Sequence, residues 1–234
     1  MEIDRIYNMD CLEGMRYIPD KTIDLVVTSP PYNLGDNHHT GNKKINPYED
    51  NMVEEDYQEW QIQVLNECAR VLKPYGSIIY NHKNRIRDGF QISPYQWLFK
   101  CNLHIKQELV WFNRSQNFDK VRFYPMTERV YWLSKSKDTQ FFNTINHHDL
   151  FTTEWPAVGT NAFHQRAFPV KFARTMICCF PEAEVILDPF MGSGTTAIAC
   201  IKEKRHFIGF ELNKEYYEKA CERIANELNE PELF

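Results

Sequence analysis

The sequence lacks the features that mark secreted, membrane-spanning and metal-binding chains. Its apolar runs stay short of the ~18 residues that a membrane-spanning helix needs, and its charged opening, residues 1–10, differs from the apolar core of a signal peptide. Its seven cysteines form no CxxC pair, so we expect reduced thiols in a core rather than disulfides or a zinc site. These absences predict a soluble, cytoplasmic protein without a metal ion or a membrane partner.

Charge is distributed unevenly along the 234 residues. The net charge of −5 argues mildly against a nucleic-acid partner. Residues 100–137, however, contain eight lysines and arginines against three acids, whereas residues 182–234 contain six against eleven. A basic segment of this kind is either a solvated face or a surface that meets phosphates.

Apolar runs and amphipathic stretches alternate along the chain, as in an α/β protein. Strands are predicted at 22–28, 76–81, 103–112, 129–135, 185–190 and 206–211. Helices are predicted at 55–74, closed by Pro74, at 197–204, and at 213–229 with Asn213 as N-cap. The pattern indicates one doubly wound domain, residues 1–234, interrupted by polar loops at 36–54 and 138–165.

The stretch DPFMGSGTT, residues 188–196, is a glycine turn between a strand and a helix. Its glycines allow a ligand to approach the backbone, and the helix N-terminus favours partial negative charge. Glu211 ends the next strand, 23 residues after Asp188, where a ribose-binding acid belongs. No lysine follows the glycines as in a phosphate loop, so a phosphate-poor nucleoside ligand fits better than ATP or NAD.

The stretch TSPPYN, residues 28–33, ends a β-branched apolar strand with two prolines and a tyrosine. Proline cannot donate to a strand ladder and fixes its own backbone angle, so the chain stops in a rigid corner. On its own, such a corner is most simply a proline-stiffened loop. Next to a nucleoside-binding glycine turn, it becomes a candidate catalytic element.

Together, SPPY and DPFMGSGT resemble the S-adenosylmethionine-dependent DNA methyltransferases that act on exocyclic amino groups. The order resembles the permuted group of that family, in which SPPY or DPPY precedes the FxGxG segment. The resemblance covers nearly the whole chain, from IYNMDCLEGM at 6–15 to FIGFELNKEYYEKACERI at 207–224. It implies a Rossmann-like methyltransferase sheet with S-adenosylmethionine as cofactor and with DNA-recognition loops at 36–54 and 138–165.

The resemblance also implies roles for individual residues. Cofactor binding falls to Asp10, Cys11, Phe168, Asp188, Phe190, Gly192, Ser193, Gly194, Thr195 and Glu211. Catalysis falls to Ser29, Pro30, Pro31 and Tyr32. DNA contacts are expected from Asn33, Arg114, Lys120, Arg122 and Arg129. The family's usual His-Pro-x-x-x-Pro segment is only partly matched by FHQRAFPVKF at 163–172.

The chemistry of the corner follows from the weak nucleophilicity of an aromatic amine. The side-chain oxygen of Ser29 and the carbonyl of Pro30 can accept the two amine hydrogens and favour a pyramidal nitrogen. Tyr32 can stack on the base, which must be flipped out of the duplex at a cost of a few kcal/mol. Serine in the first position is common in cytosine-N4 enzymes and aspartate in adenine-N6 enzymes, so cytosine N4 is preferred and adenine N6 stays open.

Other functions remain as alternatives. Cytosine C5 methylation is disfavoured because no Pro-Cys pair is present to supply a nucleophile. An RNA or protein-amide methyltransferase would favour Asn at position 29, and an inactive DNA-binding relative would be expected to lack a glycine or Tyr32. The expected partners are double-stranded DNA, a cognate restriction endonuclease and a second copy of the chain, in a bacterial or phage setting.

Overall fold

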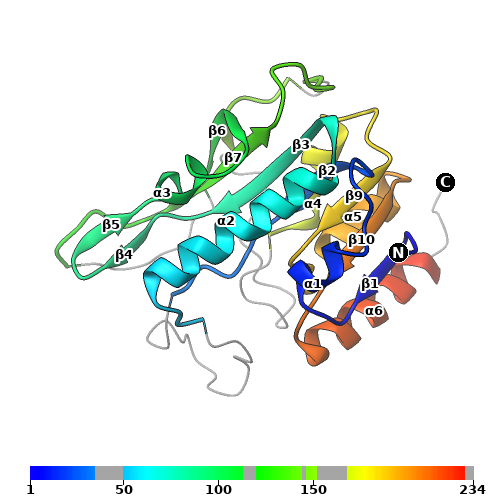
Figure 1. Cartoon of the computed structure of the whole chain (residues 1–234), viewed down its shortest axis with the longest axis horizontal. Coiled ribbons are helices and arrows are strands. Elements are labelled where there is room, and N and C mark those ends of the chain that lie inside the picture. The colour runs from blue at the N-terminus through cyan, green and yellow to red at the C-terminus, as the bar shows by residue number, and fades with distance from the viewer. Residues whose placement is uncertain (35–49, 113–119, 144–145, 152–167, 230–234) are drawn as a thin grey trace.

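The computed structural model describes residues 1–34, 50–112, 120–143, 146–151 and 168–229. Its central element is an eight-stranded sheet with the order β1-β10-β9-β2-β3-β7-β6-β8 (Figure 1). In that order the strands are Arg5–Tyr7, His206–Phe210, Val185–Asp188, Ile23–Thr28, Leu72–His82, Thr127–Ser134, His104–Phe112 and Leu150–Phe151. A small hairpin, β4 (Arg85–Arg87) and β5 (Phe90–Ile92), forms a second sheet.

The sheet has a topological switch point between β2 and β9. From β2 the chain continues outward to β3, whereas β9 leads outward in the other direction to β10. The pairs from β1 to β3 are parallel, and β7 runs antiparallel to both β3 and β6. Because ligands bind outside the carboxyl ends of the strands at such a point, the ends of β2 and β9 mark the expected site.

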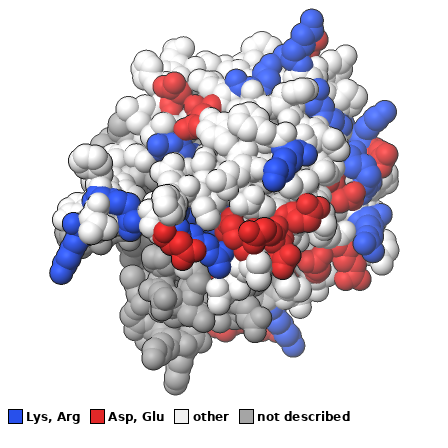
Figure 2. All heavy atoms as spheres, turned by 60° about the vertical axis from the view of Figure 1, so that its left-hand side comes forward, with Lys and Arg blue, Asp and Glu red and all other residues white. Residues whose placement is uncertain are grey.

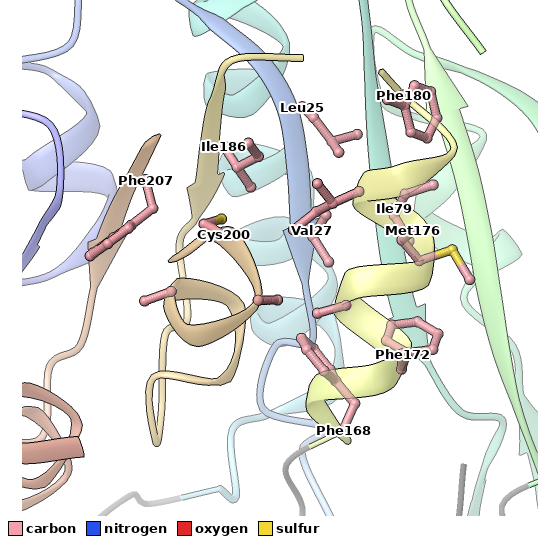
Figure 3. Packing of buried hydrophobic residues seen from close by; sticks show 14 of the residues in the cluster. Leu25, Val27, Ile79, Phe168, Phe172, Met176, Phe180, Ile186, Cys200 and Phe207 are labelled. Carbon is pink, nitrogen blue, oxygen red and sulfur yellow. The ribbon is translucent and has the colours of Figure 1, made fainter. Parts of the chain in front are cut away.

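Helices cover both faces of the sheet, as the alternation of side chains along β2 requires. Leu25 and Val27 face a cluster that includes residues of α4 (Val170–Cys178), α5 (Thr195–Lys202) and α6 (Lys214–Asn229). Val26 faces the opposite cluster, formed with α1 (Cys11–Met15), α2 (Glu54–Val71) and α3 (Tyr95–Leu98). Figure 3 shows the first cluster, with α4 lying against β2 and β3. The chain therefore forms three layers, with the doubly wound sheet in the middle.

Most predicted elements are confirmed, although several boundaries differ by a few residues. Asn213 caps α6 by accepting a hydrogen bond from the amide of Tyr216 at 2.9 Å. The helix predicted to run to Pro74 ends at Val71, because Leu72 turns to extended backbone and pairs with Ile23. Pro74 lies instead in the exposed beginning of β3, where a missing N–H donor is tolerated.

Several elements were not predicted from the sequence. These are β1, α1, the β4–β5 hairpin, α3, α4 and the short strand β8. The loop 36–54 falls outside the described residues up to position 49, and the loop 138–165 does so at 144–145 and from 152 onward. Among the described helices, none is long and apolar enough to cross a membrane.

Candidate active site

Two side chains join the carboxyl ends of β2 and β9. Thr28, the last residue of β2, donates a hydrogen bond from Oγ1 to Oδ1 of Asp188, the last residue of β9, at 2.7 Å. Ser29 follows Thr28 directly, and Asp188 opens the glycine turn. The bond therefore fixes the serine-proline corner, Ser29–Tyr32, against the glycine turn, although Thr28 and Asp188 are 160 residues apart in the sequence.

Asp188 is a buried carboxylate that holds three elements together. Besides Thr28, it accepts hydrogen bonds from the amide of Phe190 at 3.0 Å and from Oγ1 of Thr196, on α5, at 2.6 Å. Burial raises the pKa of Asp188 to about 6, and the three hydrogen bonds partly offset that rise. Its observed contacts link the ends of β2 and β9 to α5, so Asp188 holds these three elements in place around the site.

Glu211 ties the glycine turn to the start of α6. Its Oε2 accepts from the amide of Gly192 at 2.8 Å, and its Oε1 accepts from the amide of Asn213 at 2.7 Å. The side chain lies at the end of β10 and is almost completely buried. Each oxygen of a carboxylate can accept more than one hydrogen bond, and the hydroxyls of a ribose are donors of the kind that such a group binds.

The two glycines of the turn have left-handed backbone angles. Gly192 has φ +53° and Gly194 has φ +79°, a region that side chains rarely adopt. A Cβ added to Gly194 would lie 3.3 Å from Cβ of Ala220, on α6. Glycine at 194 is thus required by the backbone angle and by the packing of α6. A substitution there would act on the protein structure as well as on any ligand.

Arg223, on α6, contacts the glycine turn through its guanidinium. Its Nη1 donates to the carbonyl of Ser193 at 3.0 Å and lies within 3.3 Å of Oγ1 of Thr195. Burial lowers the pKa of this guanidinium. The hydroxyls of Ser193 and Thr195 lie 3.3 Å apart, so both predicted cofactor residues belong to one polar group at the start of α5.

The hydroxyl of Tyr32 contacts three polar side chains at the serine-proline corner. Its Oη lies 2.8 Å from Oγ of Ser29, 3.0 Å from Oδ1 of Asn81 and 3.1 Å from Oε2 of Glu128. Burial and the neighbouring Glu128 raise the pKa of Tyr32 well above its usual range. The hydroxyl is therefore neutral, and it connects Ser29 to the ends of β3 and β7.

A second layer of buried side chains lies behind the corner. The ring of His82 packs against Tyr32 with centroids 4.6 Å apart. The hydroxyl of Tyr57, on α2, donates to the carbonyl of Pro31 at 2.7 Å and lies at the same distance from Nε2 of His82. These residues bring α2 and the end of β3 into contact with Pro31 and Tyr32.

Asn33 was predicted to contact DNA, whereas in the structure its side chain forms hydrogen bonds within the protein. The side-chain amide makes two hydrogen bonds with the backbone of Met52, at 3.0 and 2.7 Å. The amide of Asn33 itself donates to Asp50 at 2.6 Å, and its φ is +53°. In these contacts, Asn33 joins the corner to the segment that precedes α2.

The opening of the chain places Asp10 and Cys11 at α1. Asp10 is the N-cap of this helix, and its Oδ1 accepts from the amides of Leu12 and Glu13. Cys11 is buried, and burial raises the pKa of its thiol. The observed role of Asp10 is helix capping, and its part in cofactor binding remains a prediction.

The two predicted aromatic cofactor residues differ in their surroundings. Phe190 is half-buried and meets the ring of Trp60, on α2, edge to face at 5.4 Å. Phe168 is buried in the core cluster, where its ring lies 5.1 Å from that of Phe172 (Figure 3). Phe190 therefore connects the glycine turn to α2, and Phe168 belongs to the core packing beside α4.

The lysine and arginines predicted to contact DNA differ in their exposure and in their contacts. Arg129 forms an ion pair with Glu108 at 2.9 Å, whereas Lys120 and Arg122 are exposed. Arg114 lies outside the described residues. Figure 2 shows lysines and arginines scattered over one face, with acidic side chains gathered near its middle. The described part of that face is thus of mixed charge.

The donor set around the glycine turn fits S-adenosylmethionine. A buried carboxylate at the end of β10 suits the ribose hydroxyls, and the start of α5 favours the carboxylate of the methionine part. The described residues contain no group of three or more His, Cys, Asp or Glu side chains that could hold a metal ion.

Sequence reasoning missed four residues that surround the corner, namely Tyr57, Asn81, His82 and Glu128. A usable signal was present at β3, because the polar pair Asn81-His82 follows a buried apolar run at the carboxyl end of a strand. Tyr57 and Glu128 carry no comparable signal. Both reach the corner only through the packing of α2 and the pairing of β7.

Comparison with known proteins agrees with this geometry. The DNA methylase family model (N6/N4 type) matches residues 23–222. The type II methyltransferase M.BglII of Bacillus subtilis is 26% identical over 268 residues, covering 99% of this chain and 72% of that protein. M.HpaI of Haemophilus parainfluenzae is 27% identical over 248 residues, covering 96% of this chain and 75% of that protein.

Solved structures share the fold. The PvuII DNA methyltransferase (cytosine-N4-specific) superposes with a TM-score of 0.77 at 22% identity, covering 96% of this chain and 90% of that one. A DNA modification methylase of Thermus thermophilus, in complex with S-adenosylmethionine, gives a TM-score of 0.71 at 22% identity, covering 96% and 94%. With the family match spanning most of its length, the chain belongs to the DNA methylase family, whose cofactor is S-adenosylmethionine.

Proposed function

We propose that the chain methylates the exocyclic amino group of a base flipped out of DNA, with cytosine N4 as the preferred target. The observation that carries this proposal is the 2.7 Å hydrogen bond between Thr28 and Asp188. It holds the corner that would receive the amine beside the turn that would receive the cofactor. Methyl transfer requires these two elements to be adjacent and rigid.

The chain's own residues would prepare the amine. Oγ of Ser29 and the carbonyl of Pro30 would accept the two amine hydrogens, so that the nitrogen lone pair is directed away from the ring. S-adenosylmethionine, when bound, supplies an electrophilic methyl group. Because the proline corner and the contacts of Tyr32 hold these acceptors in advance, little reorganisation is needed in the transition state.

Ser29 supports the choice of cytosine. A neutral serine stands where the adenine enzymes of this family commonly carry a carboxylate, and the PvuII enzyme with the same fold is cytosine-N4-specific. Adenine N6 is the second candidate, because one observation favours it. Glu128 brings a carboxylate to 3.1 Å from Oη of Tyr32, which in turn lies 2.8 Å from Ser29.

Double-stranded DNA is the proposed substrate. Lys120 and Arg122 would contact phosphates, together with Arg114 and, after release from Glu108, Arg129. The loops 36–54 and 138–165 would read the bases within a single catalytic domain. We further propose a cytoplasmic enzyme of bacterial or phage origin, paired with a restriction endonuclease and able to dimerise on its site.

Transfer of a labelled methyl group tests this proposal. Purified protein incubated with methyl-labelled S-adenosylmethionine and unmethylated plasmid DNA of varied sequence should incorporate label into the DNA. The Ser29→Ala variant should slow incorporation, because it removes one acceptor for the amine. Ser136→Ala, a substitution in a loop far along the chain, serves as the control. Absence of label in the DNA with the wild-type chain would refute the proposal.

A further inference from the structure

The carbonyl of Pro31 has a dedicated donor in the interior of the protein. Tyr57, on α2, is almost completely buried, and its hydroxyl donates to Pro31 at 2.7 Å. This carbonyl belongs to the peptide that joins Pro31 to Tyr32. The bond therefore fixes the plane of the peptide from which the side chain of Tyr32 departs.

His82 competes for the same hydrogen. Its Nδ1 lies 2.8 Å from the carbonyl of Lys83, which can only accept, so the ring hydrogen of the neutral imidazole belongs on Nδ1. Burial lowers the pKa of His82 to about 3, which keeps the ring neutral. Its Nε2 is then an acceptor at 2.7 Å from Oη of Tyr57. One hydroxyl hydrogen thus faces two acceptors, the Pro31 carbonyl and His82.

A buried cation strengthens Tyr57 as a donor. The guanidinium of Arg85 lies 4.7 Å from the centroid of the Tyr57 ring and is held by Glu54 through bonds of 2.8 and 2.7 Å. A positive charge over the ring draws electron density from the phenol oxygen, which makes its hydrogen more acidic. Burial nevertheless raises the pKa of Tyr57 well above its usual range, so the group stays a neutral donor.

His82 also supports the ring of Tyr32. The ring of His82, which is completely buried, packs against that of Tyr32 at 4.6 Å and against Trp97 at 5.1 Å. Tyr32 is therefore held at three places. Its peptide is fixed through Pro31, its ring rests on His82, and its hydroxyl bonds to Asn81.

We propose that Tyr57 is a positioning residue for methyl transfer, with its hydroxyl holding the Pro31 carbonyl and His82 serving as the alternative acceptor behind Tyr32. The inference rests on the proposed function and deepens it. Tyr57 would not touch the base or the cofactor. It would act by keeping Ser29 and Tyr32 in the geometry that the amine requires, since small misplacements of catalytic groups cost large factors in rate.

The test compares two buried tyrosines, of which only Tyr57 has a hydroxyl bonded to Pro31 among the described contacts. Tyr57→Phe removes the hydroxyl that contacts Pro31 and keeps the ring under Arg85. Tyr80→Phe is the matched control, because its hydroxyl is equally buried and bonds only to Gln61 and Trp97 among the described contacts. Single-turnover methylation at saturating S-adenosylmethionine and plasmid DNA measures the chemical step, and equilibrium binding measures the affinity for S-adenosylmethionine.

We expect Tyr57→Phe to slow the single-turnover rate by about tenfold, with unchanged affinity for S-adenosylmethionine, and Tyr80→Phe to keep the wild-type rate. Equal rates for the two variants would overturn the proposal, whether both are fast or both are slow. If the wild-type chain transfers no methyl group, the proposed function fails instead, so the two failures are distinguishable.

A second variant keeps the proposal testable if Tyr57→Phe does not fold. Replacing Tyr32 by its α-hydroxy acid turns the peptide between Pro31 and Tyr32 into an ester, whose carbonyl is a weaker acceptor for the Tyr57 hydroxyl, and leaves every side chain in place. We expect the rate to fall by about tenfold with unchanged affinity for S-adenosylmethionine. A folded ester variant that keeps the wild-type rate would overturn the assignment of Tyr57 as the determinant.

Discussion

The hydroxyl of Thr28 donates a hydrogen bond to the buried carboxylate of Asp188 across 2.7 Å. Each residue ends its strand, and the strands are neighbours at the switch point of the sheet. One bond therefore connects the segment proposed to activate the amine with the segment proposed to hold the cofactor. Disturbing it should affect both stability and catalysis.

Thr28→Val should show the cost of breaking this bond. Valine keeps the shape of threonine and removes the donor, while Asp188 retains its bonds from Phe190 and Thr196. We expect the free energy of unfolding to fall by about 1–2 kcal/mol, together with a slower methyl transfer. Urea denaturation and the labelled transfer assay measure the two effects.

The control for this change is Thr22→Val, which also removes one threonine hydrogen bond, to the carbonyl of Pro19 at the surface. Because water can replace that bond, its loss should cost less. If both variants lose the same stability and neither is slower, the Thr28–Asp188 bond does not couple the two segments.

Asp188→Asn should remove a pH dependence of stability. The folded protein raises the pKa of Asp188 to about 6, above its usual value in an unfolded chain. Folded protein therefore binds this proton more tightly, and stability falls as the pH rises from about 4 to about 6 before levelling off. The loss over that window is roughly 3 kcal/mol.

Urea denaturation between pH 4.5 and 7 measures the difference between the wild type and Asp188→Asn. The neutral amide can donate to Thr196, which lies within reach of the Val27 carbonyl as an alternative acceptor for its own hydrogen. The variant should therefore fold and lose less stability across this range than the wild type. Identical pH profiles would show that Asp188 does not titrate in it.

Lys120→Ala and Arg122→Ala should each weaken DNA binding in a salt-dependent way. Each exposed cation that contacts a phosphate contributes about 1 to the slope of log affinity against log salt. Fluorescence anisotropy with duplex DNA at several salt concentrations measures that slope. Lys214→Ala, an exposed lysine on α6, is the control. Slopes that match the control for both variants would exclude this segment from the DNA interface.

The sequence was informative wherever the function depends on neighbouring residues. SPPY and the glycine turn could be located because each is a short stretch with its own backbone demands, and β2, β9 and β10 could be located from their apolar runs. The bond between Thr28 and Asp188 could not be predicted, because it depends on which strands are neighbours in the sheet.

Residues that reach the site from other elements were beyond sequence reasoning. Tyr57 looks like any aromatic residue on an amphipathic helix, and Glu128 like any acid at a strand start. Asn33 and Arg129 suggested nucleic-acid contact by residue type, whereas their side chains bond to Met52 and Glu108 in the structure. Residue type indicates what a side chain can bind, and tertiary packing decides what it does bind.

The central claim is that this corner activates an exocyclic amine, with cytosine preferred. The most direct measurement is digestion of treated DNA to nucleosides, followed by mass spectrometry against standards. We predict N4-methylcytosine as the new product. N6-methyladenine would keep the amine chemistry and overturn the choice of base, whereas 5-methylcytosine, or no methylated nucleoside at all, would contradict the account.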